Sequence, residues 1–344
     1  MTAPSVTGSV MAAEMAEQPA VLRRLVAARE EIHEEVRRLV PRTPRGVALV
    51  GRGSSENALV FARYLLEIAT QRPATFVAPS IHDLYGVDVD YRDHLALAAS
   101  QSGRTPEIVG AVSRLATSGA ATIAVTADTS SPLATAAHVA IDLRTGIERA
   151  IPATKTFTAQ LAVAAMVAEA LGPVPWHPAD WDAAVDAVAE VVVDDQPARS
   201  VAIRLGQVSR LRTTARGVLF AVAREAALKL EETALVDVAC HSAASFRHGP
   251  IAAVSSGSAV IAISAPGPAG DDVAGLVTTL RQRGVPVVTI GPAPGSDLPV
   301  PPGLPEPLAA LSAAVRVQQL SLTVALQRGL DPDRPPGLEK VTVT

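Results

Sequence analysis

Apolar and polar residues alternate along this chain in two rhythms, which predict buried strands followed by amphipathic helices. Short apolar runs that end at glycine or serine indicate strands, and the stretches after them return to helical period. In the first half, the pattern predicts helices at 10–39, 56–68 and 106–117 and strands at 46–50, 94–99, 121–126 and 138–142. Strands that alternate with helices are typical of parallel βαβ units, so we expect an α/β fold with doubly wound parallel sheets.

The same alternation restarts after a Pro-rich stretch at 171–181 (LGPVPWHPADW), which predicts a domain boundary. Beyond it, strands are expected at 208–214, 258–264 and 285–290, and helices at 218–235 and 270–283. The chain is therefore interpreted as two copies of one α/β unit. The expected division is an N-terminal helical segment (1–40), a first unit (41–172), a linker with a helix (173–198), a second unit (199–330) and a C-terminal tail (331–344).

Composition narrows the classes of partner. The net charge is −4 and aromatic residues make up only 3% of the chain, which disfavours a nucleic-acid binder, because such proteins need a basic face or aromatic platforms. The single cysteine, Cys240, excludes an internal disulfide and a cysteine-rich metal site, and we expect a structural or solvent-facing role for it and for His241. Neither a signal peptide nor an apolar stretch of membrane-spanning length is recognised, so a cytoplasmic protein with no membrane partner is expected.

The motif Gly51-Arg-Gly-Ser-Ser55 lies between a predicted strand and a predicted helix. Glycine lets the chain turn tightly and approach a ligand closely, and the free N–H groups of a helix N-terminus favour an anion. The same sequence also fits an ordinary turn in which serine caps the helix. On its own, the motif leaves both interpretations open.

A second loop, Ser100-Gln-Ser-Gly-Arg-Thr105, has the same position between a strand and a helix. Its three hydroxyls and one amide can surround a phosphate without a metal ion. Neither loop ends in the Gly-Lys-Ser/Thr of an ATP-binding loop, and Gly51-x-Gly53 lacks the third glycine of a dinucleotide-binding loop. Together the two loops predict a site for a compact sugar phosphate, with no cofactor and no metal.

One helical face in the second half carries Glu225, Lys229 and Glu232 at spacings i, i+4 and i+7. Taken alone, Glu225 and Lys229 are best interpreted as an exposed ion pair. The segment Ser245–Pro250 (SFRHGP) then places His248 in a tight Gly-Pro turn, where an imidazole can act as a general acid or base. A purely structural histidine is the alternative.

Six segments, in this order, resemble the isomerase half of glucosamine-6-phosphate synthase: GRGSSENALVFARYLLE, SQSGRTPEIVGA, ERAIPATKTFTAQL, REAALKLEETAL, FRHGP and LEKVTVT. The resemblance extends from about Met11 to Thr344. It implies two tandem sugar-isomerase (SIS) domains that bind a sugar phosphate and form a homodimer. The first would bind the phosphate, and the second would supply the acid–base helix.

The resemblance also implies roles for individual residues. Glu232 falls at the position of the base that moves a proton between C1 and C2, and Lys229 at an active-site lysine of the same helix. His248 falls at the group that opens the sugar ring, which the partner subunit supplies in the family's dimer, and Lys340 at the tail lysine that approaches the open-chain sugar. Binding of the phosphate is implied for Ser55, Ser100, Gln101, Ser102 and Thr105, and a backbone contact to the sugar for Ile151.

The synthase carries an N-terminal glutaminase domain whose nucleophile is a cysteine, whereas here the second residue is Thr2. The expected activity is therefore that of a glucosamine-6-phosphate deaminase, which yields fructose-6-phosphate and ammonia. The Ser-Phe-Arg-His form of 245–248, Ala153 and Arg104 depart from the synthase pattern. They keep galactosamine-6-phosphate deaminase and fructosamine-6-phosphate deglycase as alternatives. A non-catalytic sugar-phosphate sensor is the alternative of another class, although no basic helix-turn-helix segment is found before Gly46.

Overall fold

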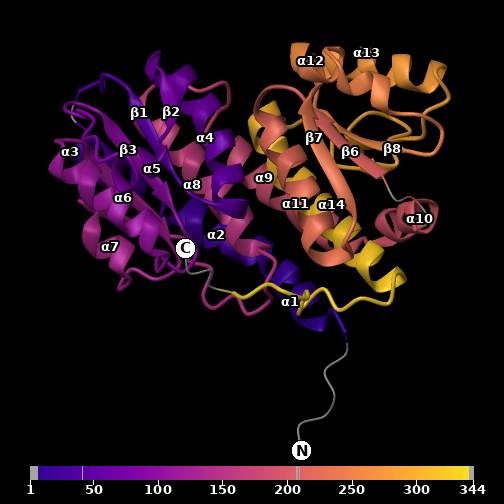
Figure 1. The fold of residues 1–344 in the computed structure, drawn as a ribbon, viewed down its shortest axis with the longest axis horizontal. Helices are drawn as coiled ribbons and strands as arrows, with labels where there is room; N and C mark the ends of the chain where they lie inside the picture. Colours follow the sequence, from indigo (N-terminus) through magenta and orange to yellow (C-terminus); the bar gives the residue numbers. More distant parts are fainter. Residues whose placement is uncertain (1–6, 41, 207, 209, 341–344) are drawn as a thin grey trace, which may run out of the picture. The chain divides into compact units, whose positions relative to one another are not determined.

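The computed structural model describes residues 7–40, 42–206, 208 and 210–340. Within them the chain forms two compact units, each with its own sheet. The sheet A unit contains residues 21–147 and 159–175, and the sheet B unit contains the residues up to Ala20 together with 148–158 and 176–340. Both sheets have five strands and all strand pairs are parallel (Figure 1). The predicted α/β fold with doubly wound parallel sheets is confirmed.

The strands of sheet A run in the order β2-β1-β3-β4-β5. They are β1 (Val47–Val50), β2 (Ala74–Phe76), β3 (Leu95–Ala99), β4 (Ala121–Thr126) and β5 (Val139–Asp142). All residues of β1 and β3 are buried, because helices cover both faces of a parallel sheet. The four strands predicted from apolar runs are therefore present, whereas the short edge strand β2 was not predicted.

The helices of the sheet A unit follow its strands in alternation. They are α3 (Arg29–Leu39), α4 (Gly53–Thr70), α5 (Ser80–Asp83), α6 (Pro106–Thr117) and α7 (Pro132–Ala136). Helices α2 (Gln18–Ala27) and α8 (Lys155–Leu171) each start in residues of the sheet B unit and continue into the sheet A unit. On one face of the sheet, Ile108, Leu115 and Leu133 of α6 and α7 form a hydrophobic cluster with Val50 and Ala98.

The single helix predicted over 10–39 is divided into α1 (Ser9–Ala16), α2 and α3. The first break, at Glu17, is explained by Pro19 in the first turn of α2. Proline has no backbone N–H, and its ring clashes with the carbonyl four residues earlier, so a continuous helix through this point is disfavoured.

The strands of sheet B run in the order β10-β9-β8-β6-β7. They are β6 (Arg210–Ala215), β7 (Asp237–Ser242), β8 (Ala259–Ile263), β9 (Val287–Gly291) and β10 (Leu298–Pro299). Counted from the first strand of each sheet, this is the same topology as in sheet A, which confirms two copies of one unit. The strand predicted at 208–214 corresponds to β6, and its residue 209 lies outside the described residues, as does 341–344 of the predicted tail.

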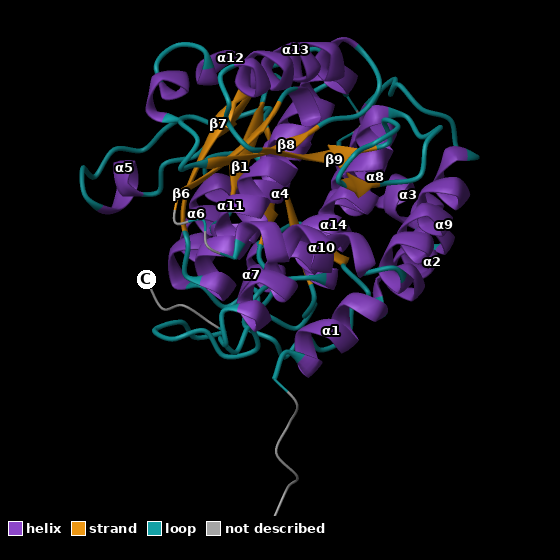
Figure 2. Cartoon of the chain, turned by 90° about the vertical axis from the view of Figure 1, so that its right-hand side faces the viewer, coloured by secondary structure: helices purple, strands orange, loops and turns teal. Residues whose placement is uncertain are grey.

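The helices of the sheet B unit enclose its sheet. They are α1, α9 (Asp180–Val193), α10 (Gln196–Leu205), α11 (Phe220–Ala234), α12 (Ala243–Phe246), α13 (Pro268–Gln282) and α14 (Glu306–Gln327), with 3-10 turns at Gly217–Leu219 and Pro250–Ala253. Helices α12 and α13 lie close together (Figure 2), and their buried residues share a hydrophobic cluster with β8. Helix α11 packs against β6, β7 and β8 and is covered in turn by α14.

Helix α14 is long and apolar enough to cross a membrane by length and composition, and it is the one such helix found among the described residues. The expectation that the chain has no stretch of that length is therefore wrong. However, 94% of its apolar window is buried inside the structure, where it packs against α9, α10 and α11. Helix α14 is thus the core helix of the sheet B unit.

Candidate active site

The two predicted phosphate loops lie next to each other at one edge of sheet A. The first follows β1 and the second follows β3, and these strands are neighbours, with Val50 paired to Ala98. The strand order reverses between them, because β1 continues to β2 on one side and β3 to β4 on the other. In open α/β sheets, ligands bind outside the carboxyl ends of the strands at such a switch point. The fold therefore brings Ser55 and the loop 100–105 to one edge of the sheet.

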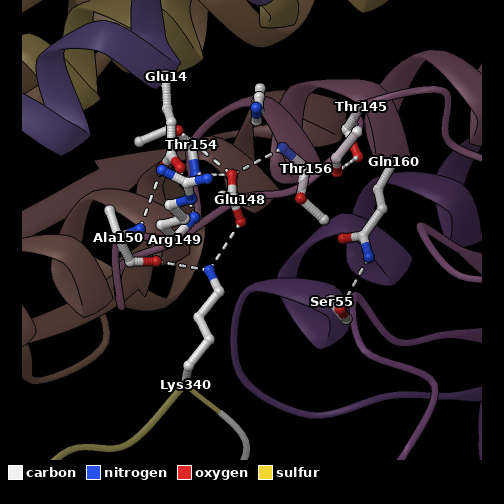
Figure 3. Close-up of polar contacts among 12 residues, drawn as sticks. Glu14, Ser55, Thr145, Glu148, Arg149, Ala150, Thr154, Thr156, Gln160 and Lys340 are labelled. Atoms are coloured by element: carbon white, nitrogen blue, oxygen red, sulfur yellow. Dashed lines mark hydrogen bonds and ion pairs between the residues drawn. The ribbon is translucent and has the colours of Figure 1, made fainter.

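The Ser55 hydroxyl is oriented by a residue that the sequence analysis did not identify. Ser55 lies in the first turn of α4 and is 8% exposed. The side-chain amide of Gln160, on α8, donates a hydrogen bond of 2.8 Å to Ser55 Oγ (Figure 3). Gln160 is itself buried, and its Oε1 has no hydrogen-bond partner among the described residues. The sequence signal that could have identified Gln160 is a glutamine within the Ala- and Val-rich sequence of α8.

The second loop is held by hydrogen bonds within the sheet A unit. Ser100 Oγ accepts the Gly103 N–H at 3.2 Å, and the Gln101 carbonyl accepts the Thr126 hydroxyl at 3.2 Å. Ser102 and Thr105 are half-buried. Thr105 is the N-cap residue of α6, yet its hydroxyl makes no capping hydrogen bond. The loop therefore presents hydroxyls and the N-terminus of a helix at the edge of the sheet, which is a suitable arrangement for an anion.

The arginines of both loops are paired with carboxylates. Arg52 lies 2.8 Å from Glu107, and Arg104 lies 2.8 Å from Asp128. Hydrogen bonds from Ser130 and the guanidinium of Arg104 lower the pKa of Asp128. Both guanidinium groups therefore already have a carboxylate partner, which leaves the hydroxyl and N–H groups of the loops as the candidate donors to an anion.

In the sheet B unit, Lys229 lies between two carboxylates of its own helix. Its ammonium contacts Glu232 directly and lies 3.6 Å from Glu225. The side chains of Lys229 and Glu225 are 0% and 1% exposed, whereas Glu232 is 21% exposed. The interpretation of Glu225 and Lys229 as an exposed pair is therefore wrong, because both side chains are buried.

The electrostatic surroundings of Lys229 are dominated by acidic groups. Burial alone would lower the pKa of Lys229, but the carboxylates of Glu225, Glu232 and Glu148 outweigh burial and raise it. The ammonium therefore stays charged and stabilises the negative charge of its neighbours. Three carboxylates and two lysines, those of Glu148, Glu225, Glu232, Lys229 and Lys340, form what we call the carboxylate–lysine cluster.

Glu148 is a second residue that the sequence analysis missed. Its side chain is 0% exposed and lies 3.0 Å from the Lys340 ammonium, which also donates a hydrogen bond of 2.6 Å to the Ala150 carbonyl (Figure 3). The N–H groups of Thr154 and Thr156 donate to the same carboxylate. Burial would raise the pKa of Glu148, but Lys340 and these N–H groups outweigh it and lower the pKa.

Lys229 and Glu232 are in direct contact, and Glu148, which pairs with Lys340, acts electrostatically on Lys229. The other predicted residues lie outside this cluster. His248 is exposed, on the turn after α12. Ile151 is half-buried and follows Ala150, whose carbonyl binds Lys340. Among 30 lysines and arginines, the chain has only three lysines, at 155, 229 and 340, and two of them belong to the cluster.

Cys240 and His241 lie on the edge strand β7, for which the sequence gave no apolar run. Burial raises the pKa of the Cys240 thiol to about 11, so the thiol stays neutral and unreactive near neutral pH. The His241 ring packs edge-on against Phe246 with centroids 6.0 Å apart. Both observations fit the structural role that was expected for this pair.

A comparison with known protein families assigns the chain to one of them. The SIS domain family matches residues 43–170 and 205–299, which is more than half of the chain. The chain therefore belongs to the SIS domain family and contains two tandem SIS-like units, as the resemblance implied.

Among curated proteins, the chain is similar to glutamine–fructose-6-phosphate aminotransferases of the isomerizing type. The protein from Pyrobaculum aerophilum is 32% identical over 350 residues, which cover 97% of this chain and 57% of the relative. The protein from Methanothermobacter thermautotrophicus is 30% identical over 306 residues, which cover 86% and 51%. The chain thus spans about half the length of these relatives.

Solved structures show the same fold. Glucosamine-6-phosphate deaminase from Thermotoga maritima superposes with a TM-score of 0.78 and 25% identity, covering 98% of this chain and 100% of that one. The C-terminal domain of glucosamine-fructose-6-phosphate aminotransferase from Francisella tularensis gives a TM-score of 0.82 at 20% identity, covering 95% and 98%. At 20% identity, the likeness to the Francisella tularensis domain shows a shared fold and nothing further.

Proposed function

We propose that this chain is a phosphosugar isomerase that acts as a deaminase on an amino-sugar phosphate, with glucosamine-6-phosphate as its substrate. The observation that carries the proposal is the exposure within the carboxylate–lysine cluster. Of its three carboxylates, those of Glu148 and Glu225 are 0% and 1% exposed and that of Glu232 is 21% exposed. Glu232 is therefore the carboxylate that a substrate can reach, and a general base must reach the proton that it removes.

The proposed chemistry uses the residues of each unit in a separate role. Hydroxyl and N–H groups of the two loops on sheet A bind the phosphate and orient the open-chain sugar. Glu232 takes the proton from C2 of the amino aldose and returns it at C1, while a proton moves from the amine nitrogen to the aldehyde oxygen. The C2–N bond thereby becomes an imine and C1 carries a hydroxyl. Lys229 contacts the Glu232 carboxylate and holds it in position. Water then adds to the imine carbon, and its oxygen becomes the ketone of fructose-6-phosphate while ammonia leaves.

The similarity to the Thermotoga maritima glucosamine-6-phosphate deaminase supports a deaminase reaction. That protein is 25% identical to this chain and superposes on it with a TM-score of 0.78. Lys340 approaches the carbonyl end of the open chain in the proposed site. Its ammonium donates hydrogen bonds to Glu148 and to the Ala150 carbonyl, and these two groups orient the tail lysine.

We also propose that the active form is a homodimer to which His248 contributes across the subunit interface. The support is that His248 is exposed on its turn and lies outside the cluster, so the imidazole is free to act on another subunit's substrate. Mixing His248→Ala protein with Glu232→Gln protein tests this directly. If each site combines residues of two subunits, mixed dimers regain about a quarter to a half of the wild-type turnover. No recovery contradicts the proposal.

The function is tested by measuring ammonia release from glucosamine-6-phosphate, galactosamine-6-phosphate and fructosamine-6-phosphate. The variants are Glu232→Gln and, as a matched control, Glu231→Gln, which removes an exposed carboxylate from the neighbouring position of the same helix. We expect turnover of glucosamine-6-phosphate that falls at least about a hundredfold in Glu232→Gln and persists in Glu231→Gln. Turnover of another sugar would change the substrate. Binding of the three sugars without turnover would contradict the proposed enzyme and favour a non-catalytic sugar-phosphate sensor.

A further inference from the structure

The N-terminal helix α1 reaches the loop that receives Lys340. Glu14, on α1, is 4% exposed, and its carboxylate accepts the backbone N–H groups of Arg149 and Ala150, the latter at 3.2 Å (Figure 3). Burial raises the pKa of Glu14, and these two N–H groups oppose the rise. A buried carboxylate is costly unless its oxygens are hydrogen-bonded. The N–H groups of Arg149 and Ala150 supply these hydrogen bonds to Glu14.

Ala150 links Glu14 to Lys340. Its N–H is donated to Glu14, and its carbonyl accepts the Lys340 ammonium at 2.6 Å. One residue therefore connects the N-terminal helix to the tail lysine. The neighbouring Glu148 holds the same ammonium at 3.0 Å, so any shift of the backbone at 149–150 displaces one of the two groups that orient Lys340.

Further contacts hold α1 and the residues that follow it, Glu17 and Gln18. Glu17 lies 2.7 Å from the buried Lys155 in the first turn of α8, and the Thr158 hydroxyl contacts the buried Gln18. In the C-terminal tail, the carboxylate of Asp333 accepts the N–H groups of Val10 and Met11 at 3.1 and 2.7 Å. Figure 1 shows the tail running beside α1. Helix α1 is thus attached both to the loop and to the tail.

We propose that Glu14 is a positioning residue of the active site, which acts through Ala150 to place the Lys340 ammonium. The inference rests on the proposed function in one respect, namely that Lys340 meets the open-chain sugar. It goes beyond that function because it assigns the N-terminal helix α1 a role in positioning Lys340. It predicts that substitution of Glu14 changes the environment of Lys340 and leaves the affinity for the phosphate nearly unchanged.

The test compares Glu14→Gln and Glu14→Ala with Glu34→Gln, which makes the same change at an exposed position of α3. The first readout is acetylation of Lys340 by acetic anhydride, followed by mass spectrometry. It is selective, because the other two lysines, Lys155 and Lys229, are 2% and 0% exposed. We expect Lys340 to react several-fold faster in both Glu14 variants and at the wild-type rate in Glu34→Gln.

The second readout is turnover of glucosamine-6-phosphate. We expect kcat to fall about tenfold in Glu14→Gln while KM changes by less than about twofold, because the reacting end is misplaced and the phosphate loops are untouched. Thermal unfolding identifies a variant that does not fold. If Glu14→Ala is such a variant, Glu14→Gln, which keeps the shape and one acceptor oxygen, decides the matter.

The outcomes separate the two proposals. An unchanged rate of Lys340 acetylation in folded Glu14→Gln overturns the role of Glu14, whatever the activity. An equal loss of kcat in Glu34→Gln overturns it as well. Faster acetylation combined with no ammonia release from any sugar, even by the wild-type protein, supports the role of Glu14 in placing Lys340 and overturns the proposed function.

Discussion

Lys229 and Glu225 face each other at 3.6 Å with side chains that are 0% and 1% exposed. A pair at i, i+4 on a solvated helix contributes a few tenths of a kcal/mol. Here both side chains are buried, and a buried charge is costly unless it is paired. The pair therefore matters for stability as well as for the charge of the cluster.

We expect Glu225→Gln to lower the free energy of unfolding by about 1–3 kcal/mol, because it removes one of the two carboxylates that pair with the buried Lys229 ammonium. Urea-induced unfolding measures the change. The control is Arg199→Ala, which removes the exposed pair of Arg199 with Asp195, whose side chains are 64% and 45% exposed. That variant should differ from wild type by less than about 1 kcal/mol. Equal losses in the two variants would contradict the prediction.

A pH dependence follows from Glu148, whose pKa lies below its ordinary value of 4.5. A carboxyl group of this kind contributes stability that is fully present above its unfolded pKa and is lost as pH falls through its folded pKa. The difference in unfolding free energy between wild type and Glu148→Gln should therefore be largest near about pH 6 and shrink toward about pH 3. The same difference for Glu34→Gln serves as the control. If the difference in unfolding free energy between wild type and Glu148→Gln is constant over this pH range, the charge of Glu148 does not stabilise the fold.

Gln160→Ala should weaken binding of the sugar phosphate. The substitution removes the hydrogen bond that orients Ser55 Oγ, a loss of about 0.5–1.5 kcal/mol that corresponds to a roughly 2- to 12-fold higher Kd. Isothermal titration calorimetry with glucosamine-6-phosphate measures it. Ser113→Ala, on the exposed face of α6, should leave Kd unchanged. A Kd for Gln160→Ala within error of wild type would remove Gln160 from the binding site.

Two glycines of the phosphate loops allow a matched comparison. Gly53 and Gly103 have φ values of 57° and 61°, so alanine is strained by about 1–2 kcal/mol at either position. A Cβ at Gly103 would also lie 2.1 Å from Ser131 Oγ, whereas a Cβ at Gly53 meets nothing within 4 Å. Gly103→Ala should therefore cost about 1–3 kcal/mol more than Gly53→Ala in the unfolding free energy. Equal costs would mean that Ser131 moves away freely.

The sequence predicted the buried strands because each is a continuous apolar run. It did not predict β2, β7 or β10. The pattern DVACHS of β7 has no apolar run, since this edge strand is only partly buried. Local pattern determines a strand only where both faces are covered, and the edges of a sheet depend on the neighbouring strand.

The site residues show a similar division. The hydroxyls of the two loops were predicted because they follow strands directly. The burial of Glu225 was not, since the i, i+4 spacing is the same on an exposed face and α14, which packs against α11, begins only at Glu306. Glu148 carried no local signal at all, because its partner Lys340 is 192 positions away.

That separation also orders the events during synthesis. At about 5–20 residues per second, Lys340 leaves the ribosome roughly 10–40 s after Glu148. Through this interval the Glu148 carboxylate has its N–H donors, but its counter-ion has not yet been made. The sheet A unit can form early in translation, whereas the sheet B unit completes its interior only after the tail has emerged. A chaperone that acts on the nascent chain would therefore find the second unit open long after the first has closed.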